Sequence, residues 1–511
     1  MIRSIICILL LIPSVCLATD YYIASGGSGE SCTSESPCAL ATALTASTSG
    51  DTIYFRSQDI WTGNSIMIAA RAGVTYDGST YGTGTRATLK PSGGSNHVIT
   101  INVSGVTVKG FELDLNSLAV GGIQTKAAYS DINGTVIDDC VIHSNTGPAS
   151  GIYSLHVGAA DGYKNSNVTI TNVTVHDVAL TPINIYPTGS DTDNNTVDTV
   201  IIRNCLVYNV TAGQAGVAIK NQSKNVTIEF CTVRDNSIPG MELYTNTASA
   251  VVAPTDLHIR YNIIARNSVG FLSQNDCLKQ ASVYIYGNLL FNNGSSGTGE
   301  IKLLSDDASP ASIYKLFNNT VYSSKSSDEL VSIKKYRSAY AAADNYTSPV
   351  VTLRNNALYA TSTKPLADSF YGSADTVHGH NLIYRPSGVA VSVTDLSPRA
   401  TANYTDGNLT TWEATAQTTA PVFDGGSLPT GFSGTYGVNL KPNTEYFRIR
   451  SGDAIDNGNG TITIDPFNGA INTSGTNLGV TRPRGSGSDI GAYEEFPTES
   501  RSTAGIGGSM R

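Results

Sequence analysis

The sequence predicts an all-β fold, a single-stranded right-handed parallel β-helix. We expect a solenoid of roughly ten coils with a short N-terminal capping helix and a loop-rich C-terminal cap. Two observations predict it. A unit of about 30 residues recurs along most of the chain. The composition, with 14% charged residues, 50 glycines and 26 tyrosines, is typical of a β-rich exported protein.

The repeat is clearest where short apolar segments such as 202–209 and 285–293 are aligned. One position in each segment holds only cysteine or asparagine: Cys140, Cys205, Cys231, Asn262, Asn288, Asn319, Asn356 and Asn381. An inward asparagine can pass side-chain hydrogen bonds to its counterpart one coil away, and a cysteine fills the same small space. We therefore predict a structural ladder along the solenoid, in which the cysteines are buried free thiols.

A second repeat predicts an outward face. Its residues recur about every 30 positions at Lys126, His156, Tyr186, Lys220, Tyr244, Gln274, Leu304 and Lys334. Residues one and three positions earlier are nearly all apolar, and alternate residues of a strand face opposite sides. The column two positions earlier should also point outward: Gln124, Ser154, Asn184, Ala218, Glu242, Leu272, Lys302 and Ser332. These columns predict a basic groove on a protein with a formal net charge of −9.

Residues 20–56 include a predicted amphipathic helix at Ala39 to Ala46 and a Gly-Asp-Thr-Ile turn at 50–53. This segment, together with the segments 447–458 and 482–496 near the other end, resembles the pectate-lyase-like superfamily of exported bacterial β-helix proteins. The resemblance implies the fold and export. Because the superfamily includes lyases, hydrolases, epimerases and surface proteins, it implies no single reaction. The motifs typical of polygalacturonases, alginate epimerases and classical pectate lyases are missing.

We expect five parts along the chain. They are a signal peptide at 1–18, an N-terminal cap and first coil at 19–60, the parallel β-helix at 61–385, a C-terminal cap and closing segment at 386–496, and a flexible tail at 497–511.

The first part indicates a secreted protein, extracellular or periplasmic, with no integral membrane segment, because no later apolar run is long enough to span a bilayer. In an oxidising compartment Cys32 and Cys38 should form a local disulfide. The acidic net charge disfavours a nucleic-acid partner. We expect a monomer whose partner is a polysaccharide.

The basic outward columns favour a polysaccharide lyase that cleaves a uronate-containing glycan by β-elimination. This reaction requires a base, an acid and neutralisation of the substrate carboxylate. The residues proposed for catalysis are Lys220, Tyr244, Tyr186 and His156, and those proposed for substrate binding are Asn184, Glu242, Lys126 and Lys302. Lys220 is the candidate base because a crowded or desolvated lysine has a lowered pKa.

Other functions stay open. A noncatalytic glycan-binding or cell-surface protein is the main alternative, because a further outward stripe could stack on sugar rings. Its members, which could instead pack on one another, are His143, His176, Tyr208, Arg234, Phe291, Tyr322, Tyr359 and Tyr384. A glycoside hydrolase needs two carboxylates, and Glu242 stands alone on the predicted strands. An epimerase is a further alternative. Asp191 and Asp193 could bind Ca²⁺ or simply form a polar turn.

Overall fold

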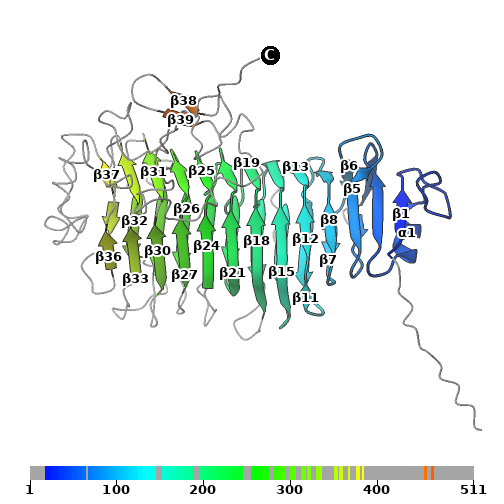
Figure 1. Cartoon of the computed structure of the whole chain (residues 1–511), viewed down its shortest axis with the longest axis horizontal. Helices are drawn as coiled ribbons and strands as arrows, with labels where there is room; N and C mark the ends of the chain where they lie inside the picture. The colour runs from blue at the N-terminus through cyan, green and yellow to red at the C-terminus, as the bar shows by residue number, and fades with distance from the viewer. Residues whose placement is uncertain are drawn as a thin grey trace, which may run out of the picture.

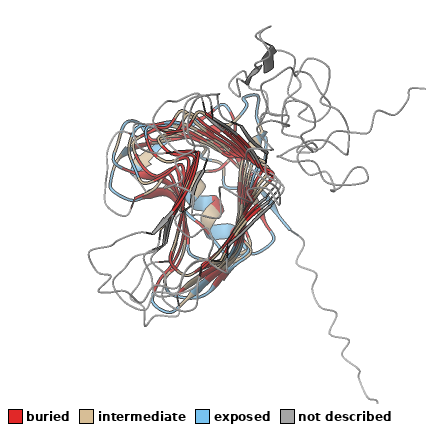
Figure 2. Cartoon of the chain, turned by 90° about the vertical axis from the view of Figure 1, so that its left-hand side faces the viewer, coloured by how far each residue is buried: buried red, intermediate tan, exposed pale blue. Residues whose placement is uncertain are grey.

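Three long parallel sheets wind around one axis in the computed structural model of the protein (Figure 1). The structure describes residues 18–64, 67–145, 152–187, 195–244, 255–275, 281–294, 299–305, 312–317, 319–323, 330–335, 350–354, 356–360, 366–368, 376–379, 382–384, 454–456 and 462–464. Viewed down the axis in Figure 2, the coils superimpose around a common interior. The predicted all-β parallel solenoid is confirmed.

We name the sheets A, B and C. Sheet A contains β1 (Asp20–Ile23), β2 (Thr52–Arg56), β5 (Thr75–Tyr81), β8 (Thr107–Lys109), β11 (Ile132–Asn133), β12 (Val136–Asp138), β15 (Lys164–Thr171), β18 (Thr196–Arg203), β21 (Ser223–Glu229), β24 (Thr255–Arg260), β27 (Ser282–Tyr286), β30 (Ile313–Phe317), β33 (Val350–Arg354) and β36 (Thr376–Gly379).

Sheet B contains β3 (Ile60–Asn64), β6 (Ala87–Gly93), β9 (Phe111–Asp114), β13 (Val141–Asn145), β16 (Thr174–Val178), β19 (Leu206–Val210), β22 (Thr232–Arg234), β25 (Ile263–Ala265), β28 (Leu289–Phe291), β31 (Thr320–Ser323), β34 (Ala357–Ala360) and β37 (Leu382–Tyr384).

Sheet C contains β4 (Ile68–Ala69), β7 (His97–Ile101), β10 (Gly121–Ala127), β14 (Leu155–Ala159), β17 (Ile183–Pro187), β20 (Val217–Lys220), β23 (Met241–Tyr244), β26 (Phe271–Asn275), β29 (Ile301–Ser305), β32 (Val331–Lys335) and β35 (Leu366–Asp368). Its 11 described strands, one per coil, agree with the roughly ten coils predicted. The short β38 (Ala454–Asp456) and β39 (Ile462–Ile464) pair antiparallel with each other.

A short helix, α1 (Leu40–Ala46), lies within the predicted range at the N-terminal end of the solenoid (Figure 1). Ala43 is fully buried, and Leu40 and Leu44 pack against the core. Cys32 and Cys38 form the predicted disulfide. In the part of the chain that the structure describes, no helix is long and apolar enough to cross a membrane. The predicted signal peptide and most of the predicted C-terminal cap lie outside the described residues.

The interior is built from inward apolar columns that repeat on every coil. In sheet C, for example, Ile183, Val217, Met241 and Phe271 follow one another across neighbouring strands, and all are buried. Because these columns continue from coil to coil, the buried side chains form one continuous core. Burial of one such side chain contributes about 1.5–3 kcal/mol. The alternate positions face outward and carry the candidate site.

The asparagine ladder lies between sheets A and B and is confirmed where it is described. Asn262 donates from its side-chain nitrogen to Asn288 Oδ1 at 3.0 Å, and Asn288 donates in the same way to Asn319 Oδ1 at 3.0 Å. Asn319 donates to Asn356 at 2.9 Å. Each amide also satisfies backbone groups in the turn, which explains its burial.

The cysteine positions of this ladder hold buried free thiols, as predicted: Cys140, Cys205 and Cys231. Asn381 and Cys277 lie outside the described residues. A second ladder, not predicted from the sequence, lies just after the sheet B strands β22, β25 and β28, at the ends opposite the first ladder. Asn236 donates to Asn267 Oδ1 at 2.7 Å, and Asn267 donates to Asn293 Oδ1 at 2.9 Å. Two parallel hydrogen-bond ladders therefore hold the coils in register.

The outward stripe on sheet B packs on itself. His143 stacks on His176 with ring centroids 5.2 Å apart, and His176 stacks on Tyr208 at 4.9 Å. The Arg234 guanidinium continues the column 4.3 Å from the Tyr208 centroid. These rings lie one above the other along the solenoid, so their faces are taken up by neighbours and not by solvent. The alternative in which the stripe packs on itself is therefore confirmed for these four residues.

Candidate functional site

The outward face of sheet C brings most of the predicted site residues together. Strand β14 pairs with β10 and β17 so that His156 lies opposite Gln124 on one side and Asn184 on the other. Lys126 and Tyr186 instead align with Gly158. From Tyr186 onward the predicted columns are correct, since Lys220 pairs with Tyr244 and Ala218 with Glu242.

The predicted register was therefore wrong for one coil. His156 belongs to the column of Asn184 and Glu242, and Ser154 lies just before the strand. The cause is unequal coil length: 32 residues separate Gln124 from His156, and 28 separate His156 from Asn184. These lengths average to 30, so equal spacing in the sequence concealed the shift. A bulge accompanies it, because the Ser154 carbonyl accepts hydrogen bonds from two successive backbone N–H groups, those of Gly122 and Ile123.

Two buried histidines, His97 and His156, form one end of the site. Their ring centroids are 6.1 Å apart. Gln124 Nε2 lies 3.1 Å from His156 Nδ1, and His156 Nε2 lies 3.4 Å from the Tyr186 carbonyl oxygen. A neutral ring with its proton on Nε2 satisfies both contacts. Gly158 leaves room for this ring, because a Cβ atom there would come within 2.8 Å of His156 Nε2.

Burial sets the charge of this histidine pair. It lowers the pKa of His97 to about 4, and the positive charge of Lys126 contributes in the same direction. It lowers the pKa of His156 to about 3, with further contributions from His97 and Lys126. Both imidazoles are therefore neutral at pH 7, and His156 is a hydrogen-bonding group fixed in one orientation.

Lys220 occupies the centre of the site among aromatic rings. Its Nζ lies 4.8 Å from the centroid of Tyr186 and 5.8 Å from that of Tyr153. Burial lowers the pKa of Lys220, while the charge of Glu242 acts in the opposite direction. Tyr244 pairs directly with Lys220 on the next strand. The amine is thus held close to the Tyr153 and Tyr186 rings in a largely desolvated position.

Glu242 is the acidic member of the site. It lies on β23, diagonally beside Lys220, and only 5% of its surface is exposed. Burial raises its pKa to about 7, against the opposing effects of the Lys220 charge and a hydrogen bond from Gln214. Its Oε2 atom has no hydrogen-bond partner among the described residues. A carboxyl group in this state exchanges its proton near neutral pH.

Asn184 is completely buried between the histidines and Lys220. Both polar atoms of its side chain lack a hydrogen-bond partner in the described part of the chain, although the Tyr153 hydroxyl is close enough to interact with it. Buried amides are nearly always hydrogen-bonded. Asn184 and Glu242 occupy one outward column two coils apart, with Ala218 between them. A buried amide and a buried carboxyl oxygen without hydrogen-bond partners on one face are typical of a site that binds a polar ligand.

The remaining predicted residues lie further along the same face. Lys126 is three coils before Lys220, and Lys302 is three coils after it. At about 4.8 Å per coil, the three amines are spaced at about 14 Å intervals along the solenoid. Both outer lysines are half-buried. Tyr153 was not predicted as a site residue, because the equal-spacing register placed it among the inward positions.

The predicted Ca²⁺ ligands Asp191 and Asp193 lie outside the described residues. Within the described ranges, no group of three or more histidine, cysteine, aspartate or glutamate residues is arranged to hold a metal ion. The described residues of this face offer an amine, a carboxyl, phenols, amides and neutral imidazoles.

Comparison with known proteins supports the fold. Residues 152–356 match the family described as the right-handed β-helix region. This match agrees with the parallel strand pairing and with the predicted right-handed parallel β-helix. No curated protein matches the sequence.

Several solved structures are similar at low identity. Pectate lyase Pel9A is 15% identical with a TM-score of 0.44, over 94% of this chain and 97% of that one. The A-module of mannuronan C-5 epimerase AlgE6 from Azotobacter vinelandii is 14% identical with a TM-score of 0.39, over 71% and 100%. The surface adhesin PfbA of Streptococcus pneumoniae is 12% identical with a TM-score of 0.35, over 57% and 82%.

Proposed function

We propose that this protein is exported and that the outward face of sheet C binds an anionic, uronate-containing polysaccharide and cleaves it by β-elimination. The observation that carries the proposal is the diagonal placement of Lys220 and Glu242 on neighbouring strands of one outward face. Burial disfavours the charged form of both groups, lowering the pKa of the amine and raising that of the carboxyl to about 7. A neutral amine and a protonated carboxyl are the base and the acid that β-elimination requires.

In the proposed reaction, Lys220 Nζ removes the proton from the sugar carbon next to the uronate carboxylate. The electrons of that C–H bond form a carbon–carbon double bond, and the bond to the glycosidic oxygen breaks. The departing oxygen takes a proton from Glu242, or from the hydroxyl of Tyr244, which pairs with Lys220 on the neighbouring strand. Asn184 supplies amide N–H groups for the substrate carboxylate, because among the described residues only the Tyr153 hydroxyl interacts with its buried side chain.

Binding is assigned to the outer lysines. Lys126 and Lys302 flank the reacting centre at about 14 Å on either side, which suits a polymer with a negative charge on successive sugar units. His156 is proposed as a positioning residue, since its neutral ring holds the side chain of Gln124. Ca²⁺ bound through Asp191 and Asp193 stays a separate proposal, tested by adding a chelator.

The experiment is incubation of the purified protein with a panel of polyuronates and sulfated glycans while the ultraviolet absorbance of unsaturated product is recorded. Lys220→Ala should abolish product formation. Lys224→Ala is the matched control, because Lys224 lies on β21 of sheet A, away from this face. Full activity in Lys220→Ala would exclude this site. Retention of the protein on a glycan without any product would favour the noncatalytic binding function instead.

A further inference from the structure

A second group of cations and aromatic rings lies on the outward face of sheet A, away from the proposed catalytic face. Arg203, Glu229, Arg260 and Tyr286 occupy one outward column on β18, β21, β24 and β27. His258, Tyr284 and Lys315 occupy the neighbouring column on β24, β27 and β30. Sheet A faces the viewer in Figure 1, and no other described element lies over these strands. We name this group the sheet A patch.

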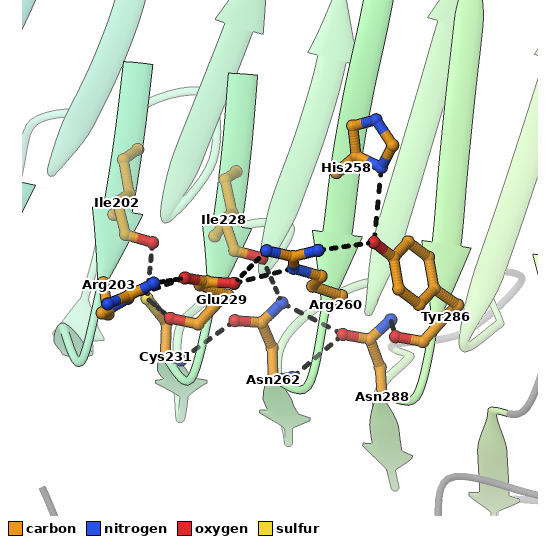
Figure 3. Close-up of polar contacts among 10 residues, drawn as sticks. All are labelled: Ile202, Arg203, Ile228, Glu229, Cys231, His258, Arg260, Asn262, Tyr286 and Asn288. Carbon is orange, nitrogen blue, oxygen red and sulfur yellow. Dashed lines mark hydrogen bonds and ion pairs between the residues drawn. The ribbon is translucent and has the colours of Figure 1, made fainter. Parts of the chain in front are cut away.

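A buried carboxylate fixes both arginines of the patch. Glu229 is only 2% exposed, and its Oε1 atom accepts hydrogen bonds from Arg203 Nε at 2.7 Å and from Arg203 Nη2 (Figure 3). Its Oε2 atom accepts from Arg260 Nε at 2.7 Å. Arg260 Nη1 also donates to the Tyr286 hydroxyl at 2.9 Å. These charge-assisted bonds hold each guanidinium in one orientation before any ligand arrives.

The arginines keep donors available for a ligand. A guanidinium has five N–H donors, and the contacts of Arg203 use only part of this set. The side chain of Arg203 is 47% exposed and that of Arg260 is 34% exposed. Since Glu229 is itself buried, a ligand meets the arginines and not the carboxylate. Planar guanidinium groups bind carboxylate and sulfate oxygens through paired hydrogen bonds.

Flat aromatic surface adjoins these cations. The His258 and Tyr284 rings stack with centroids 4.8 Å apart and planes within 9° of each other. Lys315 Nζ lies 5.4 Å from the Tyr284 centroid. Tyr284 and Tyr286 are both half-buried, with part of each side chain reaching solvent. Aromatic rings beside cations provide an apolar surface for a sugar ring and charge for its acidic substituents.

We infer that the sheet A patch is a second binding surface for an anionic polysaccharide. Arg203, Arg260 and Lys315 bind its carboxylate or sulfate groups. The faces of the Tyr284 and Tyr286 rings already contact His258, Lys315 and Arg260, so the parts of these side chains that reach solvent, and not their faces, contact the sugars. From β18 to β30 the patch spans five coils, about 19 Å, which accommodates several sugar units. Three cations against one buried carboxylate make the patch positive on a protein of net charge −9. This surface goes beyond the proposed function, because binding here requires no chemistry on sheet C.

The test is the affinity of the full-length protein for fragments of a sulfated glycan and of a polyuronate, with a neutral glucan as the third ligand, by titration calorimetry. The protein carries Lys126→Ala, Lys220→Ala, Lys302→Ala and Lys334→Ala, which remove the four lysines of the two predicted outward columns of sheet C. We expect retained binding of at least one anionic glycan, weakening with salt, and no binding of the glucan. Adding Lys315→Glu should weaken binding about tenfold, equivalent to about 1.4 kcal/mol. The matched control Lys224→Glu, on β21 at the opposite end of the strand from Glu229, should change it less than twofold.

A second variant addresses the arginines without leaving a buried charge unpaired. Arg203→Gln, Glu229→Gln and Arg260→Gln together remove the two cations and the carboxylate that they compensate, and should abolish the remaining binding. Equal affinity in Lys315→Glu and Lys224→Glu, or no anionic glycan bound in the starting protein, would overturn the inference. Product formation by the protein with an intact sheet C is measured separately. If the protein with an intact sheet C forms no product but the sheet C variant still binds an anionic glycan, the proposed function is wrong and the sheet A inference stands.

Discussion

Glu242 lies diagonally across from Lys220 on the neighbouring strand, on the same outward face of sheet C, because Lys220 pairs with Tyr244. Burial raises the pKa of the Glu242 carboxyl and lowers the pKa of the Lys220 amine. The free energy needed to keep a carboxyl in such a position depends on pH, which leads to the first prediction.

Glu242→Gln should stabilise the protein at alkaline pH. The pKa of Glu242 is raised from 4.5 to about 7 in the folded protein, so between these values the folded state holds a proton that the unfolded state has lost. The free energy of unfolding therefore falls as pH rises through this window, by up to about 3 kcal/mol. Urea unfolding should show the variant more stable than wild type at pH 8 and similar at pH 4.5. Equal midpoints at pH 8 would contradict the raised pKa.

His156→Gln should reduce acid sensitivity. The pKa of His156 is lowered from 6.5 to about 3, so below pH 6.5 the unfolded state binds a proton that the folded state excludes. This single histidine removes about 3 kcal/mol of stability between pH 6.5 and pH 4. Urea unfolding from pH 7 to pH 4 should show that the free energy of unfolding falls less in His156→Gln than in wild type. An equal loss of stability in His156→Gln and wild type would contradict the lowered pKa of His156.

Much of this architecture could be predicted from the sequence, because inward columns and ladders repeat at nearly constant spacing. Ile183, Val217 and Met241 are recognisable as a core column from their period alone. The shift at His156 was not predictable in this way, since coils of 32 and 28 residues average to the expected 30. The burial of Asn184 and Glu242 was also missed, because strand alternation indicates direction but not what covers an outward side chain.

The sheet A patch had a signal in the sequence that went unused. Arg203, Glu229, Arg260 and Tyr286 each precede a ladder residue by two positions, so the ladder alignment itself places them in one outward column. Alternating arginine and glutamate in adjacent strands predicts cross-strand ion pairs. What the alignment does not give is that Glu229 is buried while its arginines remain partly exposed.

The ladder provides a prediction about stability. Asn288→Ala should destabilise the protein by about 2–4 kcal/mol, because several buried groups lose partners at once. Its amide donates to the Ile259 carbonyl at 2.8 Å and accepts from the Asn262 backbone N–H at 3.0 Å. Asn102→Ala removes an exposed asparagine just after β7 and should cost far less. Thermal unfolding of both variants compares the two positions. An equal decrease in melting temperature would show that the ladder asparagine contributes no more stability than an exposed one.

The three ladder cysteines should be unreactive in the native protein. Burial raises the pKa of Cys140 to about 12 and that of Cys231 well above its ordinary value, and the thiolate is the reactive form. Cys205 is also buried, and its Sγ contacts the Arg203 carbonyl oxygen at 3.3 Å. In a protein that lacks residues 1–18 and carries Cys277→Ser, so that Cys7 and Cys16 are also absent, titration with an aromatic disulfide reagent should detect no thiol before denaturation and three after it. The reagent can reach these thiols only when the coils separate. The labelling rate should therefore rise with urea concentration in parallel with the unfolded fraction. Rapid labelling of native protein would show instead that the ladder opens without global unfolding.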